Sequence, residues 1–294
     1  MNCENKIYRS VEQYRVPLTL NLRGRLLEFS RPLVMGILNI TPDSFFDKSR
    51  IMGAEEAAKR AGMMLAQGAD ILDIGACSTR PGSSAVSVDE ELARLEGPLE
   101  AIRKANPGAV ISVDTFRADV ALECLLRWNV DIINDISGGE EEGMFETVAE
   151  FGAGYVLMHM RGTPADMDLH CDYTTDVTTE VVKELSFKLA KARLAGVANV
   201  IVDPGFGFAK NSEQNYELLA NLEKLKVLEC PVLAGVSRKR FVREAADCDV
   251  TDALIPTVAM NAVAILNGAD IIRVHDVAEG FLTAKAVGKL RIKN

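Results

Sequence analysis

The sequence reads GADILD at residues 68–73 and GADIIR at residues 268–273, with the variant NVDIIN at residues 129–134. Each copy begins with a glycine or an asparagine, residues that tolerate the left-handed conformation that commonly ends a helix. A short apolar run follows at once and stops at a polar or charged residue. We therefore predict that each copy is a turn that joins the end of a helix to the start of a buried strand.

Strand and helix patterns of this kind alternate about eight times along the chain. The apolar runs stop at eight polar residues: Asn39, Asp73, Asp114, Asn134, His159, Asp203, Ser237 and Arg273. Strands that alternate with helices indicate βαβ units in a parallel sheet, whose strands are apolar throughout because both faces are covered. The seven intervals between Asn39 and Arg273 average about 33 residues (234/7), and an eightfold barrel of about 250 residues needs roughly 31.

These intervals favour a (β/α)8 TIM barrel of the α/β class over residues 31–294. No GxGxxG motif follows the first apolar run, which argues against an open dinucleotide-binding sheet. Residues 1–30 lie before the first unit and contain two short strand-like runs around Arg23 and Gly24. We expect this N-terminal extension to form a β-hairpin that closes the floor of the barrel.

Composition restricts the partners and the location of the protein. The net charge of −9 argues against a general attraction to nucleic acid or to an anionic membrane surface. The six cysteines are scattered without a CxxC pair, and the three histidines lack the spacing of a zinc finger. Residues 1–30 lack the apolar core of a signal peptide, and no apolar stretch reaches the ~18 residues of a membrane span. The sequence predicts a cytoplasmic protein that binds small molecules and neither nucleic acid nor membranes.

Polar side chains follow almost every predicted strand. In a (β/α)8 barrel, the carboxyl ends of the strands and the loops after them form the active site. A single aspartate in this place is often only the N-cap of the next helix, whereas six or more polar strand ends at one mouth indicate a shared site. Asp73 is expected to be the exception, because its strand continues to Ile74 and Gly75 and its carboxylate can serve the barrel interior instead.

Eight short motifs resemble those of the dihydropteroate synthases, which are pterin-binding enzymes. They cover about residues 33–280, follow the order of that family, and place one signature after every predicted strand. The motifs are GILNITPDSF at 36–45, STRPG at 78–82, VDT at 113–115, INDISGG at 133–139, MHMRG at 158–162, DPGFGF at 203–208, SRK at 237–239 and RVHD at 273–276. One tripeptide of this kind is weak evidence, but eight in order make the chain similar to this family as a whole.

The resemblance implies a transferase of folate biosynthesis. Members of the family condense 6-hydroxymethyl-7,8-dihydropterin diphosphate with p-aminobenzoate to give 7,8-dihydropteroate and diphosphate, with Mg²⁺ as cofactor. They are sulfonamide targets, because sulfonamides mimic p-aminobenzoate, and the family analogy also implies a homodimer built on helices. The apolar segment 253–267 is a candidate for that interface, with the barrel interior as the alternative place for it.

The resemblance also implies the residues of the site. The pterin is expected to contact six of them: Asp114, Asn134, Met158, Asp203, Phe208 and Lys239. The diphosphate is expected to contact three: Asn39, Arg273 and His275. The p-aminobenzoate is expected to contact four: Thr79, Arg80, Pro81 and Lys239. The implied Mg²⁺ ligands are Asn39 and Asp47, and the implied catalytic residues are Asp47, Arg80 and Lys239.

The residue types assigned to the pterin and to the diphosphate suit the chemistry of these two ligand groups. A pterin edge carries an amino group beside a ring N–H, and an ionised carboxylate such as Asp203 accepts from both at once. Arg273 and His275 alternate along one strand, so their side chains leave the same face, toward the phosphate site common after the last barrel strands. The polar strand ends thus divide into a pterin group and a diphosphate group that Lys239 joins, and we expect Asp73 to belong to neither.

Two loops depart from the family pattern. The first loop lacks the usual serine and paired glycines around Asp47 and carries instead Phe46, Lys48 and Ser49. In the second loop Cys77 replaces a usual glutamate, and it is either a buried filler, which we favour, or a reactive thiol. Beyond these loops, Arg240 follows Lys239 where some members have serine.

Two other functions stay open at this point. A methyltetrahydrofolate:corrinoid methyltransferase shares the pterin residues, but it needs neither the STRPG loop nor the SRK anion site that this chain has. A non-catalytic pterin-binding paralogue is compatible with the altered loops, although the residues implied for anion binding are all retained.

Overall fold

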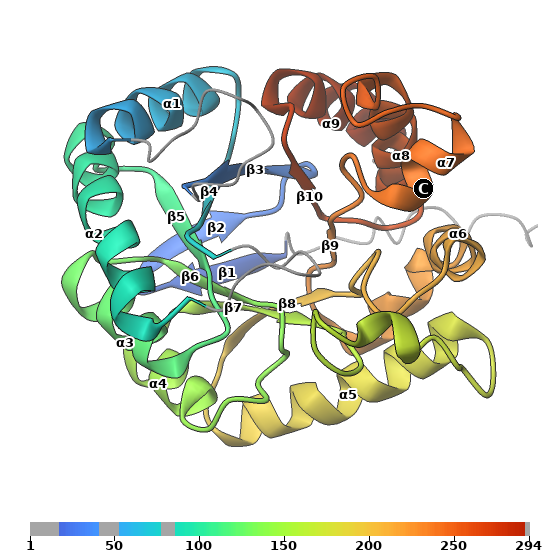
Figure 1. The fold of residues 1–294 in the computed structure, drawn as a ribbon, viewed down its shortest axis with the longest axis horizontal. Coiled ribbons are helices and arrows are strands. Elements are labelled where there is room, and N and C mark those ends of the chain that lie inside the picture. The colour runs from blue at the N-terminus through green and yellow to red at the C-terminus, as the bar shows by residue number, and fades with distance from the viewer. Residues whose placement is uncertain (1–17, 41–52, 78–85, 292–294) are drawn as a thin grey trace, which may run out of the picture.

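The apolar runs form the strands of a closed parallel barrel. A computed structural model describes residues 18–40, 53–77 and 86–291, and Figure 1 shows the strands at the centre of a ring of helices. The barrel strands are β3 (Leu33–Asn39), β4 (Ile71–Gly75), β5 (Val110–Asp114), β6 (Ile132–Asp135), β7 (Gly154–Met158), β8 (Asn199–Asp203), β9 (Leu233–Ala234) and β10 (Ile271–Val274). They pair in the order β8-β7-β6-β5-β4-β3-β10-β9, and a parallel bridge between Val202 and Val232 joins the two ends of this sheet. The predicted (β/α)8 TIM barrel is confirmed.

Helices follow the strands and cover the outside of the barrel (Figure 1). They are α1 (Ala54–Ala66), α2 (Val88–Ala105), α3 (Ala118–Arg127), α4 (Met144–Phe151), α5 (Val177–Leu194), α6 (Ser212–Ala220), α7 (Arg240–Ala245), α8 (Leu254–Leu266) and α9 (Val277–Arg291). Two 3-10 segments, η1 (Met167–Leu169) and η2 (Leu222–Leu228), lie in the connections. Within the described ranges, the helices are too short or too polar to cross a membrane.

The predicted turns between helices and strands have the backbone that their residue types allow. Gly68, Asn129 and Gly268 have φ angles of 104°, 51° and 111°, all in the left-handed region. At the opposite ends of the connections, Asp176 and Asn211 cap α5 and α6 by accepting hydrogen bonds from backbone N–H groups. These turns lie at the amino ends of the strands, opposite the mouth, whereas the two caps mark where loops at the mouth end and α5 and α6 begin.

Side chains along each strand alternate between the barrel interior and the surrounding helices. The outward side chains pack with the helices in one large cluster, which includes Val34, Leu72 and Ile111. The inward side chains near the amino ends form a second apolar cluster, the barrel floor: Leu33, Met35, Ile71, Val110, Ile132, Val156, Ile201, Leu233 and Ile271. Two residues further along four of these strands, the inward positions carry Asp73, Asn134, Asp203 and Arg273. The barrel is therefore apolar at one end and polar at the mouth.

The N-terminal extension closes the apolar end, as predicted. Strands β1 (Thr19–Leu22) and β2 (Arg25–Glu28) pair antiparallel around a two-residue turn at Arg23 and Gly24, both with positive φ. Leu20 and Leu22 are buried and pack in the barrel floor. The hairpin thus shields the apolar interior from water, and the opposite end is left for ligands.

Candidate active site at the barrel mouth

A cation from the last strand joins the carboxylates at the centre of the mouth. Arg273 on β10 donates from Nε to Asp73 on β4 at 2.7 Å and from Nη2 to Asp114 on β5 at 2.8 Å. Asn134 on β6 donates from Nδ2 to the same Asp73 oxygen at 3.0 Å. Four strands therefore contribute to one network, and Asp73 is its common acceptor.

Asp73 was expected to belong to neither the pterin group nor the diphosphate group, yet it contacts one predicted residue of each, Asn134 and Arg273. Its side chain is buried and points inward, because it lies two residues beyond Ile71 of the barrel floor. Its Oδ2 holds Asn134 and Arg273, whereas its Oδ1 has no hydrogen-bond partner among the described residues. A buried acceptor without a partner is costly, so Asp73 favours a ligand that brings a donor to this place.

Burial shifts both predicted pterin carboxylates toward their neutral form. It raises the pKa of Asp114 to about 7, against the opposing charge of Arg273. It also raises the pKa of Asp203, against the charge of Lys239 and a hydrogen bond of 2.7 Å from the N–H of Gly205 to Asp203 Oδ1. Both carboxylates are poorly hydrated acceptors, so a ligand that donates N–H hydrogen bonds to them stabilises their ionised form.

Lys239 lies over the ring of Phe208 and beside the loop that follows Asp203. Its Nζ is 4.5 Å from the ring centroid, within range of a cation–π interaction, and it donates a hydrogen bond to the carbonyl oxygen of Phe206. Burial lowers the pKa of Lys239 to about 8, although the charge of Asp203 raises it. The structure thus brings together Lys239, Phe208 and Asp203, which the resemblance implies for pterin binding.

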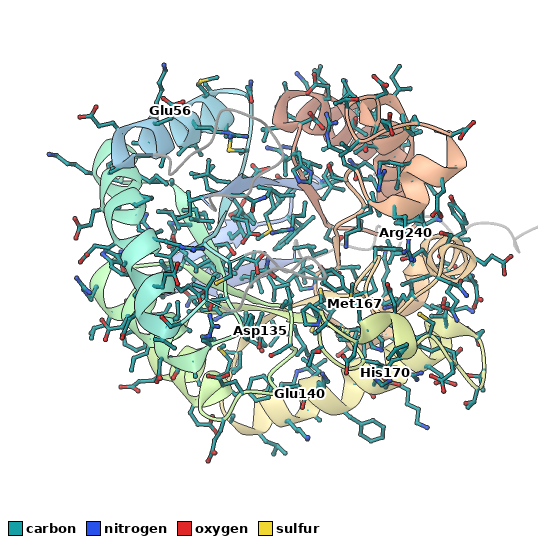
Figure 2. The ribbon with its side chains drawn as sticks, viewed as in Figure 1. Glu56, Asp135, Glu140, Met167, His170 and Arg240 are labelled. Atoms are coloured by element: carbon teal, nitrogen blue, oxygen red, sulfur yellow. The ribbon has the colours of Figure 1, made fainter. Side chains whose placement is uncertain are left out.

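An apolar wall lies beside these polar groups. One buried cluster includes Met158, with Phe208 packed against it, and its other members and neighbours are Phe116, Ile136, Met160, Met167 and Ala209. Met167 belongs to η1 in the loop after β7 and is labelled in Figure 2. The sequence pattern predicted Met158 and Phe208 only. A signal for three others existed, because Phe116, Ile136 and Met160 each lie two residues beyond a predicted pterin residue.

The other predicted diphosphate residues lie at neighbouring strand ends. Asn39 ends β3 in register with Gly75 of β4. A side-chain carbon on Gly75 would lie 3.4 Å from Asn39 Oδ1 and 4.0 Å from Asp114 Oδ2, so the glycine leaves space beside both oxygens. His275 follows β10, and its Nδ1 is 2.9 Å from the Oγ of Ser237.

Several predicted residues lie outside the described ranges, in 41–52 and 78–85. They are Asp47, Thr79, Arg80 and Pro81, together with the loop substitutions Phe46, Lys48 and Ser49. Their roles stay predictions.

Cys77 has the surroundings of a filler. Burial raises the pKa of its thiol to about 12, and the charge of Glu91 adds to this effect. The Sγ lies 3.6 Å from Nη1 of Arg117. A thiol with so high a pKa stays protonated near neutral pH and is a weak nucleophile, which favours the structural interpretation over the reactive one.

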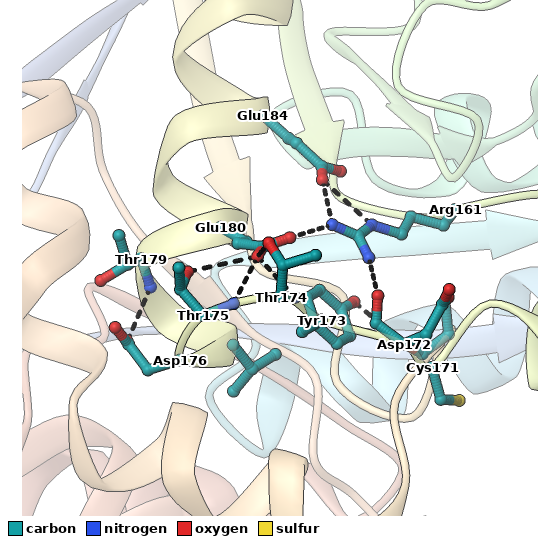
Figure 3. Close-up of polar contacts among 12 residues, drawn as sticks. Arg161, Cys171, Asp172, Tyr173, Thr174, Thr175, Asp176, Thr179, Glu180 and Glu184 are labelled. Atoms are coloured by element: carbon teal, nitrogen blue, oxygen red, sulfur yellow. Dashed lines mark hydrogen bonds and ion pairs between the residues drawn. The ribbon is translucent and has the colours of Figure 1, made fainter.

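One polar strand end faces away from the mouth. His159 directly follows β7, is 1% exposed, and lies between Glu184 Oε2 at 2.9 Å and Lys210 Nζ at 3.0 Å. Figure 3 shows that Arg161 binds the same Glu184 with Nε and Nη2, at 3.0 and 2.5 Å, and reaches Glu180 at 2.5 Å. We call these five residues the supporting network. The sequence indicated His159 only as one of the polar strand ends of the mouth, and the supporting network was not predicted. His159 comes one residue after the inward Met158, so its side chain points outward.

The fold and the mouth together define a (β/α)8-barrel enzyme that binds a small, flat ligand rich in hydrogen-bonding groups. Buried carboxylates supply acceptors, Lys239 and Arg273 supply cations, and the apolar wall supplies a surface for a ring.

Known proteins resemble this chain over nearly its whole length. The family described as "Pterin binding enzyme" matches residues 35–275. The dihydropteroate synthase of Escherichia coli (strain K12) is 41% identical over 264 residues, which are 89% of this chain and 93% of that protein. A crystal structure of the Yersinia pestis dihydropteroate synthase with a sulfonamide drug is 39% identical, with a TM-score of 0.88 and coverage of 94% of this chain and 100% of that chain. The Thermus thermophilus dihydropteroate synthase in complex with 4-aminobenzoate is also 39% identical, with a TM-score of 0.83 and coverage of 93% and 100%.

The chain therefore belongs to the pterin-binding enzyme family, in which it groups with the dihydropteroate synthases. Other relatives are longer. The chain spans about half the length of the mitochondrial folate synthesis bifunctional proteins of Arabidopsis thaliana and Pisum sativum, at 40% identity and 52% and 55% of their lengths.

Proposed function

We propose that this protein is an active dihydropteroate synthase, which condenses 6-hydroxymethyl-7,8-dihydropterin diphosphate with p-aminobenzoate. The observation that carries the proposal is the grouping of Asp203, Lys239 and Phe208 at the mouth, where Lys239 lies over the Phe208 ring and bonds to the loop that also orients Asp203. Asp203 suits the amino group and ring N–H of a pterin, Lys239 suits its ring acceptors, and Phe208 suits its flat face. Asp73 and Asp114 offer further acceptors at the same mouth.

The reaction needs little acid–base chemistry from the protein. An aromatic amine is neutral at pH 7 and attacks without losing a proton first, so the difficult step is cleavage of the C–O bond at the pterin methylene. The electron-rich ring assists that step by delocalising positive charge. The protein then has to align amine and carbon, and to stabilise the departing diphosphate.

Arg273 and His275 are our candidates for stabilising the diphosphate. A guanidinium has five N–H donors and stays charged, so Arg273 can bind phosphate oxygens while it keeps its hydrogen bonds to Asp73 and Asp114. His275 is oriented by Ser237, whose Oγ accepts a hydrogen bond of 3.3 Å from the His275 backbone N–H.

Mg²⁺ fits this arrangement as a partner of the diphosphate. Among the described residues, no three His, Cys, Asp or Glu side chains are grouped to hold a metal ion. Mg²⁺ commonly uses only one or two protein oxygens and takes its other ligands from phosphate and water. Gly75 places no side chain between Asn39 Oδ1 and Asp114 Oδ2, and we propose Asn39 and Asp47 as the protein ligands of the ion. When bound, the ion neutralises charge on the leaving diphosphate.

Thr79, Arg80 and Pro81 complete the proposed p-aminobenzoate pocket together with Lys239, and Asp47, Arg80 and Lys239 are the proposed catalytic residues. Loops after the first two barrel strands then exclude water, which would otherwise capture a cationic intermediate. Sulfonamides, as mimics of p-aminobenzoate, are expected to inhibit.

Arg240 is the residue that follows Lys239 where some dihydropteroate synthases have serine. It is labelled in Figure 2 and begins α7 with a side chain that is 59% exposed.

We also propose a cytoplasmic homodimer. Helices α8 and α9 lie side by side (Figure 1) and expose large apolar side chains at Ile255 (79%), Leu266 (52%), Leu282 (63%) and Leu290 (59%). A face of this kind suits a second copy of the chain. Scattered cysteines without a paired pattern suit a reducing compartment.

A direct assay tests the activity. Purified protein is incubated with Mg²⁺, the pterin diphosphate and radiolabelled p-aminobenzoate, and labelled dihydropteroate is measured. We expect product from the wild type and almost none from Lys239→Ala. Absence of product above that control contradicts the proposal, and pterin binding without product identifies a non-catalytic paralogue instead.

A further inference from the structure

Lys210 is a buried lysine that the reaction described above does not use. It is 1% exposed and lies in the loop between β8 and α6, directly after residues 204–209. Its Nζ lies 3.1 Å from the carbonyl oxygen of Gly205, 3.0 Å from that of Phe208, and 3.0 Å from Nδ1 of His159. An ammonium group has three N–H donors, so these contacts use all of them.

The burial of this charge has a cost that apolar packing would avoid. Removing an ammonium from water costs several kcal/mol unless its partners compensate. Burial lowers the pKa of Lys210 to about 7, although the charge of Asp203 raises it. A methionine at this position would fill the same space without that penalty, so the lysine provides something that packing alone does not.

The third acceptor of Lys210 is itself held in place. His159 accepts at Nδ1, so its proton is on Nε2, which donates to Glu184 Oε2 at 2.9 Å. Burial lowers the pKa of His159 to about 4, which keeps the ring neutral and able to accept. Arg161 binds the other carboxylate oxygen of Glu184, Oε1 (Figure 3). The supporting network therefore anchors the lysine on α5, a helix outside the barrel.

A second anchor acts on the same loop. Tyr173 donates from its hydroxyl to the carbonyl oxygen of Ala209 at 3.0 Å, and Arg161 lies over the Tyr173 ring at 4.0 Å from its centroid. The carbonyls of Gly205, Phe208 and Ala209 are thus all fixed from the side of α5 and the loop after β7.

The anchored loop carries the groups that form the mouth. The N–H of Gly205 orients the Asp203 carboxylate, and Phe208 presents its ring beneath Lys239. Gly205 has a φ of 70°, and a side chain there would collide with the carbonyl oxygen of His159. A shift of the loop therefore moves the acceptor and the ring surface together.

We infer that Lys210 is a positioning residue for the pterin substrate: its ammonium fixes residues 204–209 so that Asp203 and Phe208 stand where the pterin ring binds. This inference rests on the proposed function for the identity of the ligand. Its structural part, the immobilisation of the loop, does not depend on that function.

Direct binding separates positioning from general stability. The dissociation constant of 6-hydroxymethylpterin and the KM of p-aminobenzoate are measured well below the melting temperature of each variant. For Lys210→Met we expect the pterin constant to rise at least about tenfold, since small misplacement of binding groups is costly. The KM of p-aminobenzoate should rise less than the pterin constant, because Lys239 is the one proposed p-aminobenzoate contact for which the structure shows a bond to residues 204–209, through the carbonyl of Phe206. Equal loss for both substrates, or unchanged pterin binding in a folded variant, overturns the inference.

Two further variants complete the test. Lys188→Met is the matched control. Like Lys210, Lys188 donates to a loop carbonyl, that of Ser137 at 3.1 Å, but this loop follows β6. We expect unchanged pterin binding in this variant. Tyr173→Phe removes the hydroxyl that donates to the Ala209 carbonyl. We expect about fivefold weaker pterin binding from this one lost hydrogen bond. This variant tests the inference if Lys210→Met does not fold. Unchanged pterin binding in Tyr173→Phe would then overturn the inference.

Hydrogen exchange measures the loop without any ligand. Amides of residues 204–209 should exchange faster in Lys210→Met than in the wild type or in Lys188→Met. If the wild type binds no pterin but exchange in the loop still increases, the proposed function fails and the immobilising role of Lys210 stands. Unchanged exchange in a folded Lys210→Met variant overturns that role.

Discussion

The guanidinium of Arg273 lies 2.7 Å from the carboxylate of Asp73, and these two residues are 200 positions apart in the chain. The last and the second strands of the barrel meet in this contact, across the first strand that lies between them in the sheet. Arg273 thus compensates buried negative charge and also presents a cation to the mouth, so its two roles are coupled.

Removal of this cation should affect stability as well as catalysis. Arg273→Met leaves Asp73 and Asp114 buried without their shared partner, and we expect the free energy of unfolding to fall by about 3–5 kcal/mol. Urea denaturation measures the loss. The control is Arg127→Met, since Arg127 forms an exposed ion pair with Glu96, and its loss should cost at most about 1 kcal/mol. Equal stability of the two variants would contradict the coupling.

Asp73 should contribute to pterin binding. Asp73→Asn keeps the shape of the side chain but removes its charge and one acceptor, and we expect about tenfold weaker binding of 6-hydroxymethylpterin. Calorimetric titration measures this constant. If binding is unchanged, Asp73 serves only the barrel interior, as the sequence first suggested.

Asp203 should matter more than any other single acceptor. Asp203→Ala removes the carboxylate that suits two neighbouring donors of the pterin, and we expect at least about a hundredfold weaker pterin binding. Asp176→Ala is the control, because Asp176 caps α5 through the N–H of Thr179. Its loss should cost about 1 kcal/mol of stability and leave pterin affinity unchanged. An Asp203→Ala variant with wild-type affinity would mean that the pterin lies elsewhere.

His159 should make the protein less stable in acid. Its pKa is about 4 when folded and about 6.5 when unfolded. Between these values only the unfolded chain binds the proton, so this contribution to unfolding free energy is complete above pH 6.5 and declines as the pH falls toward 4. The change amounts to about 3 kcal/mol. Unfolding curves from pH 7 to 4 should be flatter for His159→Gln, and parallel curves would disprove this origin.

The exposed apolar residues of α8 and α9 should hold a second copy of the chain. Ile255→Asp places a charge on this face, and we expect the dimer to dissociate at micromolar protein concentration, as measured by light scattering after gel filtration. Leu126→Asp on α3 is the control, because Leu126 is also exposed, at 63%. A wild-type monomer, or dissociation in both variants, would rule out this interface.

Sequence patterns predicted the barrel and its hairpin, because alternation and turn residues are local signals, and the polar strand ends predicted a shared polar mouth. The role of each residue at the mouth came from the resemblance to the dihydropteroate synthases and stays a prediction. Asp73 lies two residues beyond Ile71, and this spacing indicated an inward side chain, but its contacts with Asn134 and Arg273 were not predicted. His159 shows the converse, since it follows an inward methionine by one residue and faces outward. Lys210 had no signal, because lysine is mostly found at the surface and its partner His159 lies 51 positions away in the chain. Local periodicity fixes the direction of a side chain, whereas burial of a charge depends on long-range packing.

The two ends of the barrel sheet meet between β8 and β9. Strand β9 has two residues, and one bridge, Val202 to Val232, connects its segment to β8. Lys239 reaches over this joint to the carbonyl oxygen of Phe206. A ligand held by both Asp203 and Lys239 therefore fastens the two margins of the sheet to each other. Ligand binding at the mouth and unfolding of the barrel are then linked equilibria, so a ligand that bridges Asp203 and Lys239 raises the free energy of unfolding.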